Sequence, residues 1–293
     1  MDPTSPYFNQ VQLLINVLPT IAEHHVFALK GGTAINLFIR DLPRLSVDID
    51  LAYEPVNNRD ESLADIHFNL IEIKQKLEQK GLQVIANDPE KANRLFVSNG
   101  QARIKIETSP VLRGTVHPVA TESVQQKVEQ LFGYAEIQML SFDDLYAGKL
   151  CAALDRQHPR DLFDVKCLLE NEGISESLKN TFLVYLISHQ RPIAELLSPH
   201  RIDIKESFRK EFESMTTDVV TIEELEEARE ELILTISTML TDQDKQFLLD
   251  LKQGKPDWKS FYYPDVQELP AVKWKCYNLQ NMSAAKKKSA LEN

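Results

Sequence analysis

The chain has 293 residues, of which 43% are hydrophobic and 26% charged, so it is long enough to bury one large core or two modest ones. Its formal net charge of −11 argues against a protein that binds nucleic acid mainly through phosphates, but not against an enzyme that touches one nucleic-acid end through a local basic patch. We expect a cytoplasmic protein with no membrane span, disulfide framework or zinc site, because no run approaches roughly 18 apolar residues and the three cysteines form no CxxC pair.

An amphipathic helix is predicted at about residues 8–24, where Val11, Leu14, Ile15 and Leu18 follow the i, i+3, i+4, i+7 spacing. A short strand from Val26 to Leu29 follows, and Gly31-Gly32 then breaks the chain. Thr33 is expected to open a new helix through Phe38, because its hydroxyl can accept a hydrogen bond from an amide of the first turn.

A half-buried strand is predicted from Ser46 to Tyr53, in which apolar residues alternate with Asp48 and Asp50. Side chains two residues apart on a strand lie on the same face. The two carboxylates should therefore point together, away from the core.

A long helix is predicted from about Ser62 to Lys80, and Gly81 suits the position just after its last turn. Strand-like residues 82–85 come next. A hairpin is then expected around Asn99-Gly100, a dipeptide that tolerates the positive φ angles of a tight turn.

The hairpin strands are expected at Arg94–Val97 and Gln101–Thr108. In the second of them, apolar residues alternate with Arg103, Lys105 and Glu107. Glu107 should therefore lie on a polar face of this strand.

The second half of the chain is predicted to be helical, with one helix beginning after the capping-box-like pair Ser141 and Asp144 and another at Pro159. We place the domain boundary between about residues 133 and 141. This leaves an α/β domain of residues 1–138 and a helical domain of residues 139–293, whose last part, from about Pro256, is expected to be an irregular tail.

Asp48 and Asp50 form the first candidate site. Two carboxylates this close repel each other, and a hard cation relieves that repulsion, which favours Mg2+. Surface strands often carry acidic pairs, so the pair alone is a weak signal. Gly31-Gly32-Thr33 strengthens it, because unhindered amides and a hydroxyl can bind phosphate oxygens beside the metal.

Glu107 can supply a third carboxylate, as two-metal nucleotidyl transfer requires. Taken alone, a surface salt bridge with Lys105 or Arg103 is the simpler interpretation of this residue.

Lys149 and Arg156 are seven residues apart on one predicted helix and can neutralise a triphosphate, or can simply form a solvated basic stripe. Arg160, Asp161 and Asp164 lie at the start of the next helix, where acidic groups also interact favourably with the helix dipole.

The segments KGGTAINLF, RLSVDID, KIE and KLCAALDRQHPRDLFD occur in the order found in AbiEii-like nucleotidyltransferase toxins. The chain resembles this family, a branch of the DNA polymerase beta superfamily, from about Leu29 to Leu169, and LPAVKWKCYNL resembles the family's C-terminal end. The resemblance implies an α+β fold, in which a polymerase-beta-like nucleotidyltransferase domain with a mixed sheet precedes a helical C-terminal domain.

The resemblance also implies roles for individual residues. Asp48 and Asp50 would bind Mg2+, with Glu107 as the third acidic residue. Lys149 corresponds to the family's nucleotide-binding lysine, and Asp161 to an acidic position needed for activity. The residues implied to bind the triphosphate, or to lead into the acidic pair, are Gly31, Gly32, Thr33, Arg44 and Ser46.

The implied function is the Mg2+-dependent transfer of a nucleotide from an NTP to tRNA by a toxin that is paired with an antitoxin protein. One alternative is a transferase that modifies a small molecule or a protein, to which the acidic composition lends weight. Another is a non-catalytic NTP-binding regulatory protein, which the intact acidic set argues against. An RNA acceptor would need a local basic surface, for which the candidates are Arg156, Arg160 and nearby residues of the helical half, together with Lys286 to Lys288.

Overall fold

The computed structural model describes residues 6–216 and 218–282, which belong to two compact units. The first contains the chain up to Leu145 and the segment Arg209–Val220, and the second contains Tyr146–Phe208 and the chain from Thr221 onward. The return of residues 209–220 to the first unit interrupts the simple two-part order expected from the sequence.

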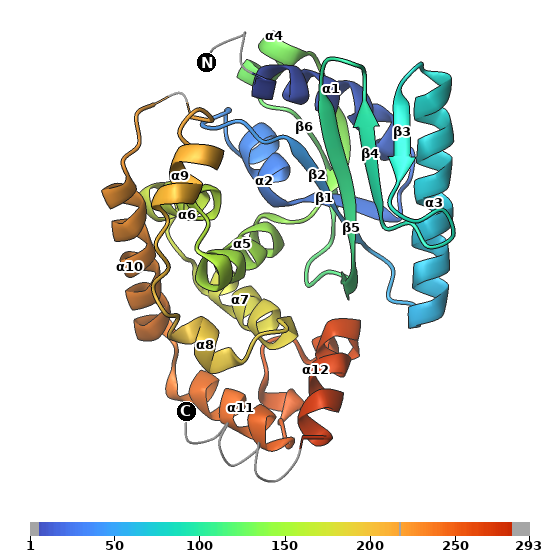
Figure 1. Cartoon of the computed structure of the whole chain (residues 1–293). Coiled ribbons are helices and arrows are strands. Elements are labelled where there is room, and N and C mark those ends of the chain that lie inside the picture. The colour runs from blue at the N-terminus through green and yellow to red at the C-terminus, as the bar shows by residue number, and fades with distance from the viewer. Residues whose placement is uncertain (1–5, 217, 283–293) are drawn as a thin grey trace. The chain divides into compact units, whose positions relative to one another are not determined.

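The first unit is built on a mixed seven-stranded sheet of order β3-β4-β5-β2-β1-β7-β6 (Figure 1). Strands β2 and β5 are parallel, as are β1 and β7, and the other neighbours are antiparallel. The strands are β1 (Phe27–Lys30), β2 (Asp48–Tyr53), β3 (Gln83–Ala86), β4 (Arg94–Ser98), β5 (Arg103–Arg113), β6 (Ala120–Ser123) and β7 (Glu136–Met139). The mixed sheet that the resemblance implied is confirmed.

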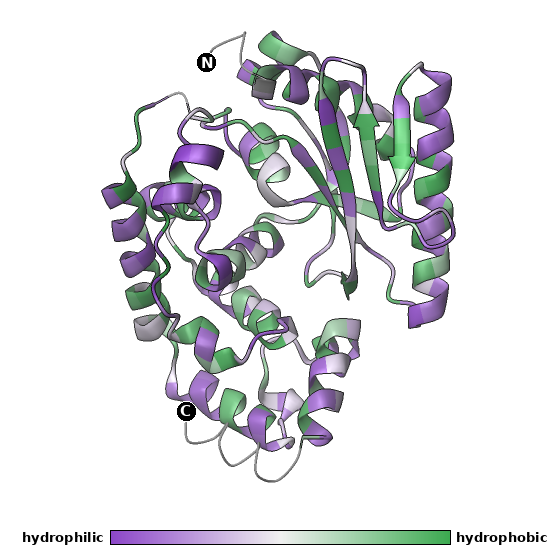
Figure 2. Cartoon of the chain, in the orientation of Figure 1, coloured by the Kyte–Doolittle hydropathy of each residue, from purple (hydrophilic) through white to green (hydrophobic). Residues whose placement is uncertain are grey.

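Helices of this unit pack against the sheet: α1 contacts β5 and β7, and α3 contacts β3 and β4. Buried apolar residues recur along α3 at helical spacing, and polar residues occupy its outer side, an alternation that Figure 2 shows along both α3 and β5. The helical elements are α1 (Pro6–Ala22), α2 (Gly31–Ala34), the π-helix η1 (Ile35–Ile39), α3 (Arg59–Gln79) and α4 (Gln126–Phe132).

Two local predictions need correction. The helix after the glycine turn begins at Gly31, with Lys30 at its N-cap and no side-chain cap, so Thr33 does not open it. The hairpin connection is four residues long, between Ser98 and Arg103, because the Asn99 side chain accepts hydrogen bonds from the amides of two residues that follow it. Gly100 has a φ of +87°, as the prediction of a turn required.

The second unit is helical, as predicted, and Pro159 is the first residue of α6. The expectation of an irregular tail from Pro256 is wrong for α12, which Pro270 opens and which buries Ala271, Val272 and Leu279. Residues 283–293, with Lys286 to Lys288, lie outside the described part. The helices assigned here are α5 (Phe142–Arg156), which begins in the first unit, α6 (Pro159–Asn171), α7 (Glu176–Ser188), α8 (Ile193–Leu197), α9 (Lys205–Glu211), which ends in the first unit, α10 (Ile222–Met239), α11 (Asp242–Gln253), α12 (Pro270–Gln280) and the 3-10 turns η2 (Trp258–Ser260) and η3 (Pro264–Glu268).

Candidate active site

The glycine turn, Gly31-Gly32 at the start of α2, lies directly against the acidic pair. Gly31 has a φ of +76°, and a Cβ atom added there would lie 2.8 Å from Oδ2 of Asp50. A Cβ atom on Gly32 would lie 2.6 Å from Nη2 of Arg44 and 3.0 Å from Oγ of Ser46. Only glycines permit this approach, so five of the residues singled out from the sequence converge at one place.

Thr33 holds the start of β2 against this turn. Its hydroxyl is buried and lies 2.5 Å from the carbonyl oxygen of Asp48, to which it donates, and 3.0 Å from Oγ of Ser46. The hydroxyl therefore fixes the position of the acidic strand relative to the glycine turn.

The acidic residues share one face of the sheet. Asp50 is the register partner of Lys30 on β1 and of Glu107 on β5, and Asp48 is the partner of Lys105. Register partners on adjacent strands point to the same face, and adjacent strands lie about 4.8 Å apart. The parallel pairing of β2 with β5 thus brings Glu107 next to Asp50.

Glu107 is held by two cations. Its carboxylate lies 2.8 Å from Nζ of Lys105 and also pairs with Arg94, its neighbour on β4. Burial alone would raise the pKa of Glu107, but these two cations outweigh burial and lower it. The salt bridge with Lys105 that the sequence offered as an alternative is therefore present, whereas the Arg103 guanidinium lies over the ring of Phe96.

Lys105 links the three carboxylates electrostatically. Its partial burial would lower its pKa, but the hydrogen bond to Glu107 and the fields of Asp48 and Asp50 raise it. The sequence indicated Lys105 only as a possible salt-bridge partner of Glu107. The β2–β5 register additionally places Lys105 beside Asp48.

The donor set fits a magnesium ion in type and in accessibility. Asp48 and Asp50 are half-buried, and carboxylate oxygens are the ligands that Mg2+ prefers. The bare Cα of Gly31 leaves space beside Asp50 that any side chain would fill. Within residues 6–216 and 218–282, however, no three acidic, histidine or cysteine side chains are grouped closely enough to hold a metal together. Glu107 would have to leave its cations to join the pair.

The segment that returns from the second half supports the approach to the acidic pair. The amide of Leu45 donates to the carbonyl oxygen of Met215 at 2.8 Å, and Arg44 forms a β-bridge with Thr216. The Arg44 side chain is buried beside Gly32. Nothing in the local sequence of residues 209–220 indicated this role, because the pairing joins positions far apart in the chain.

Lys149 and Asp161, the remaining predicted site residues, lie in the second unit in a buried ion-pair cluster. Nζ of Lys149 lies 2.8 Å from Oδ1 of Asp161 and 2.9 Å from Oδ2 of Asp164. Arg156 also donates to Asp161, through Nε at 2.5 Å and Nη2 at 3.0 Å. The prediction that Lys149 and Arg156 share one face of α5 is confirmed, because both contact Asp161. Lys149 also pairs with Asp164.

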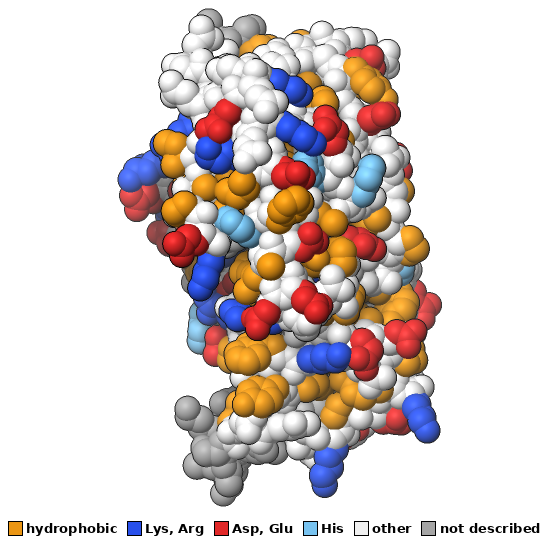
Figure 3. Space-filling model, turned by 90° about the vertical axis from the view of Figure 1, so that its right-hand side faces the viewer, with side chains coloured by type: hydrophobic (Ala, Val, Ile, Leu, Met, Phe, Trp, Pro, Cys, Tyr) orange, Lys and Arg blue, Asp and Glu red, His pale blue; other side chains and the backbone are white. Residues whose placement is uncertain are grey.

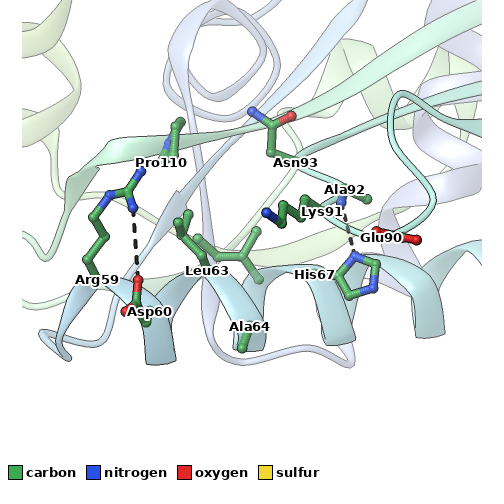
Figure 4. Close-up of a pocket in the computed structure, with 11 residues that line it drawn as sticks. Arg59, Asp60, Leu63, Ala64, His67, Glu90, Lys91, Ala92, Asn93 and Pro110 are labelled. Carbon is green, nitrogen blue, oxygen red and sulfur yellow. Dashed lines mark hydrogen bonds and ion pairs between the residues drawn. The ribbon is translucent and has the colours of Figure 1, made fainter.

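A pocket of about 580 Å3 lies elsewhere in the first unit, between α3 and the chain leading into β4 (Figure 4). Leu63, Ile66 and Pro110 contribute apolar surface, and Arg59 and Lys91 contribute charge. None of the residues predicted for the active site lines it.

Charged side chains of both signs are interspersed with hydrophobic ones on the face shown in Figure 3. This mixture is consistent with the acidic overall composition, which does not favour a broad basic surface. In the described part of the chain, no helix combines the length and the apolarity needed to cross a bilayer.

The fold has a counterpart among solved structures. The chain superposes on the nucleotidyltransferase toxin MenT4 of Mycobacterium tuberculosis H37Rv with a TM-score of 0.64, at 12% sequence identity, over 94% of this chain and 93% of that one. The fold is therefore that of a nucleotidyltransferase toxin. A comparison with curated proteins yields no match.

The family follows from the sequence profile of the nucleotidyl transferase AbiEii toxin of type IV toxin–antitoxin systems, which matches residues 12–274. The chain belongs to this family, as the motifs indicated. It is accordingly a nucleotidyltransferase, which sets aside the non-catalytic alternative, and membership in a toxin–antitoxin family implies an antitoxin partner.

Proposed function

We propose that this toxin transfers a nucleoside monophosphate from an NTP to a hydroxyl group of tRNA in the cytoplasm and releases pyrophosphate. The observation that carries the proposal is the contact of the Gly31-Gly32 turn with Asp50, Arg44 and Ser46. An anion-binding turn and a pair of carboxylates then meet within a few ångströms, as nucleotidyl transfer needs.

In this proposal, Asp48 and Asp50 hold Mg2+, and Glu107 is the third acidic residue. The bound metal would supply charge neutralisation for the triphosphate. Lys105 and Arg94 neutralise Glu107 when no metal is bound, and their ammonium and guanidinium groups are then available to phosphate oxygens if Glu107 turns toward the acidic pair.

The glycine turn would bind the triphosphate through its backbone amides, with the buried Arg44 guanidinium and the Ser46 hydroxyl behind it. Thr33 keeps the turn and the acidic strand at a fixed separation through its bond to the Asp48 carbonyl. The acceptor oxygen then forms a bond to the α-phosphorus while the bond to the pyrophosphate oxygen breaks. Catalysis of this kind depends mainly on positioning and charge.

Lys149 is proposed to contribute charge for the nucleotide. Asp161, which holds Nζ of Lys149 at 2.8 Å, then acts by positioning that lysine. The tRNA acceptor rests on the resemblance to toxins that modify tRNA. A small-molecule or protein acceptor is the alternative, and the net charge of −11 is the observation that favours it.

The test is incubation of the purified chain with each α-labelled NTP, Mg2+ and a total cell extract, followed by separation of RNA, protein and small molecules. We expect label in tRNA, and a loss of more than about 100-fold in Asp48→Ala and Asp50→Ala, because each removes a charge-stabilising group at the reacting centre. Both variants should stay folded, since the two carboxylates repel each other without metal.

Asp60→Asn is the matched control, because Asp60 is an exposed carboxylate of the same unit at the start of α3. Its transfer should equal that of the parent chain. Unchanged turnover in Asp48→Ala or Asp50→Ala would refute the site, and label confined to protein or small molecules would refute the tRNA acceptor.

A further inference from the structure

Helix α12 carries an exposed aromatic pair on the side opposite its buried face. Ala271, Val272 and Leu279 are buried, whereas Trp274 and Tyr277 are 57% and 58% exposed. Large aromatic side chains usually bury most of their surface, so two neighbours exposed to this degree point to a binding role.

The two rings form a flat surface. Their centroids are 5.8 Å apart and their planes differ by 17°, an offset stacked arrangement that follows from the i, i+3 spacing on a helix. Among the described residues, neither ring stacks on any other aromatic group. An offset pair of this kind leaves ring faces open to a further planar group.

The helix beneath the rings is firmly attached to its own unit. Nζ of Lys275 donates to the carbonyl oxygens of His189 and Arg191, each at 2.7 Å. The aromatic pair is therefore presented on a fixed support, which lowers the entropy lost when a ligand binds.

The chain around this helix is basic although the protein is acidic. The described residues 269–282 contain two lysines, Lys273 and Lys275, and no aspartate or glutamate, in a chain of net charge −11. Lys273, beside Trp274, pairs with Glu268 at 2.7 Å, but both side chains are more than half exposed, so this pair is weak and can be exchanged for a phosphate.

We propose that this face of α12 binds unpaired nucleotides of single-stranded RNA, with bases stacked on Trp274 and Tyr277 and a phosphate near Lys273. Stacking platforms flanked by cations are how proteins bind single strands without reading their sequence. The inference rests on the proposed function for the identity of the RNA as acceptor. The binding step itself needs neither an NTP nor the acidic face.

The test measures binding of a short fluorescein-labelled oligouridylate to the full chain by anisotropy at low salt, without NTP. We expect Trp274→Ala and Tyr277→Ala each to weaken binding about fivefold or more, because that is the lower range for losing one base–aromatic stack. Phe68→Ala is the matched control, since Phe68 is a 59% exposed aromatic residue on α3 in the first unit, and its affinity should be unchanged.

A second measurement leaves the aromatic pair intact. The chain has two tryptophans, and Trp258 packs against Phe247, so Trp258→Phe makes Trp274 the sole tryptophan at little structural cost. Its emission should fall when the oligonucleotide is added, because a stacked base quenches the ring. Binding without such a change would overturn the proposal.

The proposal would also be overturned if both alanine variants bound the oligonucleotide with the parental affinity, or if Phe68→Ala lost as much affinity as they did. Absence of any oligonucleotide binding would overturn it as well, and would indicate that the aromatic pair binds a protein partner. These results are separable from the proposed function. Label transfer to tRNA that survives Trp274→Ala and Tyr277→Ala would sink only this surface, whereas oligonucleotide binding without label transfer would sink only the tRNA acceptor.

Discussion

At the scale of single residues, Gly31 and Gly81 differ in why a glycine is needed: Gly81 only provides a left-handed backbone, whereas Gly31 also leaves room for a neighbouring side chain. Both have positive φ, +76° and +83°, but only Gly31 has a neighbour, Asp50, where a Cβ atom would stand. We expect Gly81→Ala to lower the free energy of unfolding by about 1–2 kcal/mol, the strain of a left-handed residue, without changing transfer. Gly31→Ala should show the same strain and also lose most transfer, because Asp50 must move.

Urea unfolding and label transfer, measured on both glycine variants, decide this comparison. If Gly31→Ala transferred label as well as Gly81→Ala, the contact with Asp50 would have no catalytic role.

Lys149 is the residue for which stability and catalysis must be separated. Lys149→Ala leaves the carboxylates of Asp161 and Asp164 buried without their ammonium partner, and breaking a buried pair costs about 3–5 kcal/mol. We expect NTP use to fall far more than in Lys80→Ala, which removes an exposed side chain that donates to Thr20. If both variants lost NTP use equally at a temperature where both are folded, Lys149 would have no role in nucleotide binding.

The same variant has a predictable pH dependence. Burial alone would raise the pKa of Asp161, but Lys149 and Arg156 lower it. A lowered carboxyl pKa stabilises the fold above the unfolded value near 4, and this stabilisation is lost as pH falls through the folded value. Lys149→Ala removes one lowering charge, so circular dichroism should show its acid unfolding at a higher pH than in the parent chain.

At the scale of elements, the start of α5 depends on one buried carboxylate. Asp144 accepts from the amides of Val116 and His117, each at 3.0 Å, and from the Ser141 hydroxyl at 2.8 Å. The predicted capping box thus also ties a distant loop to the helix. Asp144→Asn should cost about 2–3 kcal/mol, because two charge-assisted bonds are weakened in a buried position.

Ser175→Ala, which removes an ordinary N-cap from α7, is the matched comparison and should cost about 1 kcal/mol. Thermal unfolding of both variants measures the difference. Equal losses would show that Asp144 acts only as a cap.

At the scale of the whole molecule, the proposed tRNA acceptor requires an acidic chain to bind RNA through few phosphate contacts. Affinity falls with salt in proportion to the number of phosphates neutralised, so we expect a slope of about three in a plot of log affinity against log salt. A chain ending before Lys286 should show a shallower slope. A salt titration of tRNA labelling by both chains measures this, and a slope near eight would contradict a small basic patch.

The sequence by itself determined the features that depend on neighbouring positions. The glycine turn, the shared face of Asp48 and Asp50, the helix starts at Ser141 and Pro159, and the family could all be predicted, because backbone freedom, strand alternation and capping act over a few residues. The helix at 270–280 was missed, because only three of its side chains are buried and its periodicity is weak.

Only the tertiary structure decided which distant residues meet. The parallel register of β2 with β5 places Glu107 beside Asp50, and the antiparallel register of β4 with β5 gives it Arg94 as a partner. Met215 returns from the second half of the chain to accept the hydrogen bond of the Leu45 amide. Lys149 likewise gains its two carboxylate partners from the next helix. These contacts join residues that are far apart in the sequence. They depend on strand register and loop closure, which the packing of the whole chain sets and which a local sequence pattern does not encode.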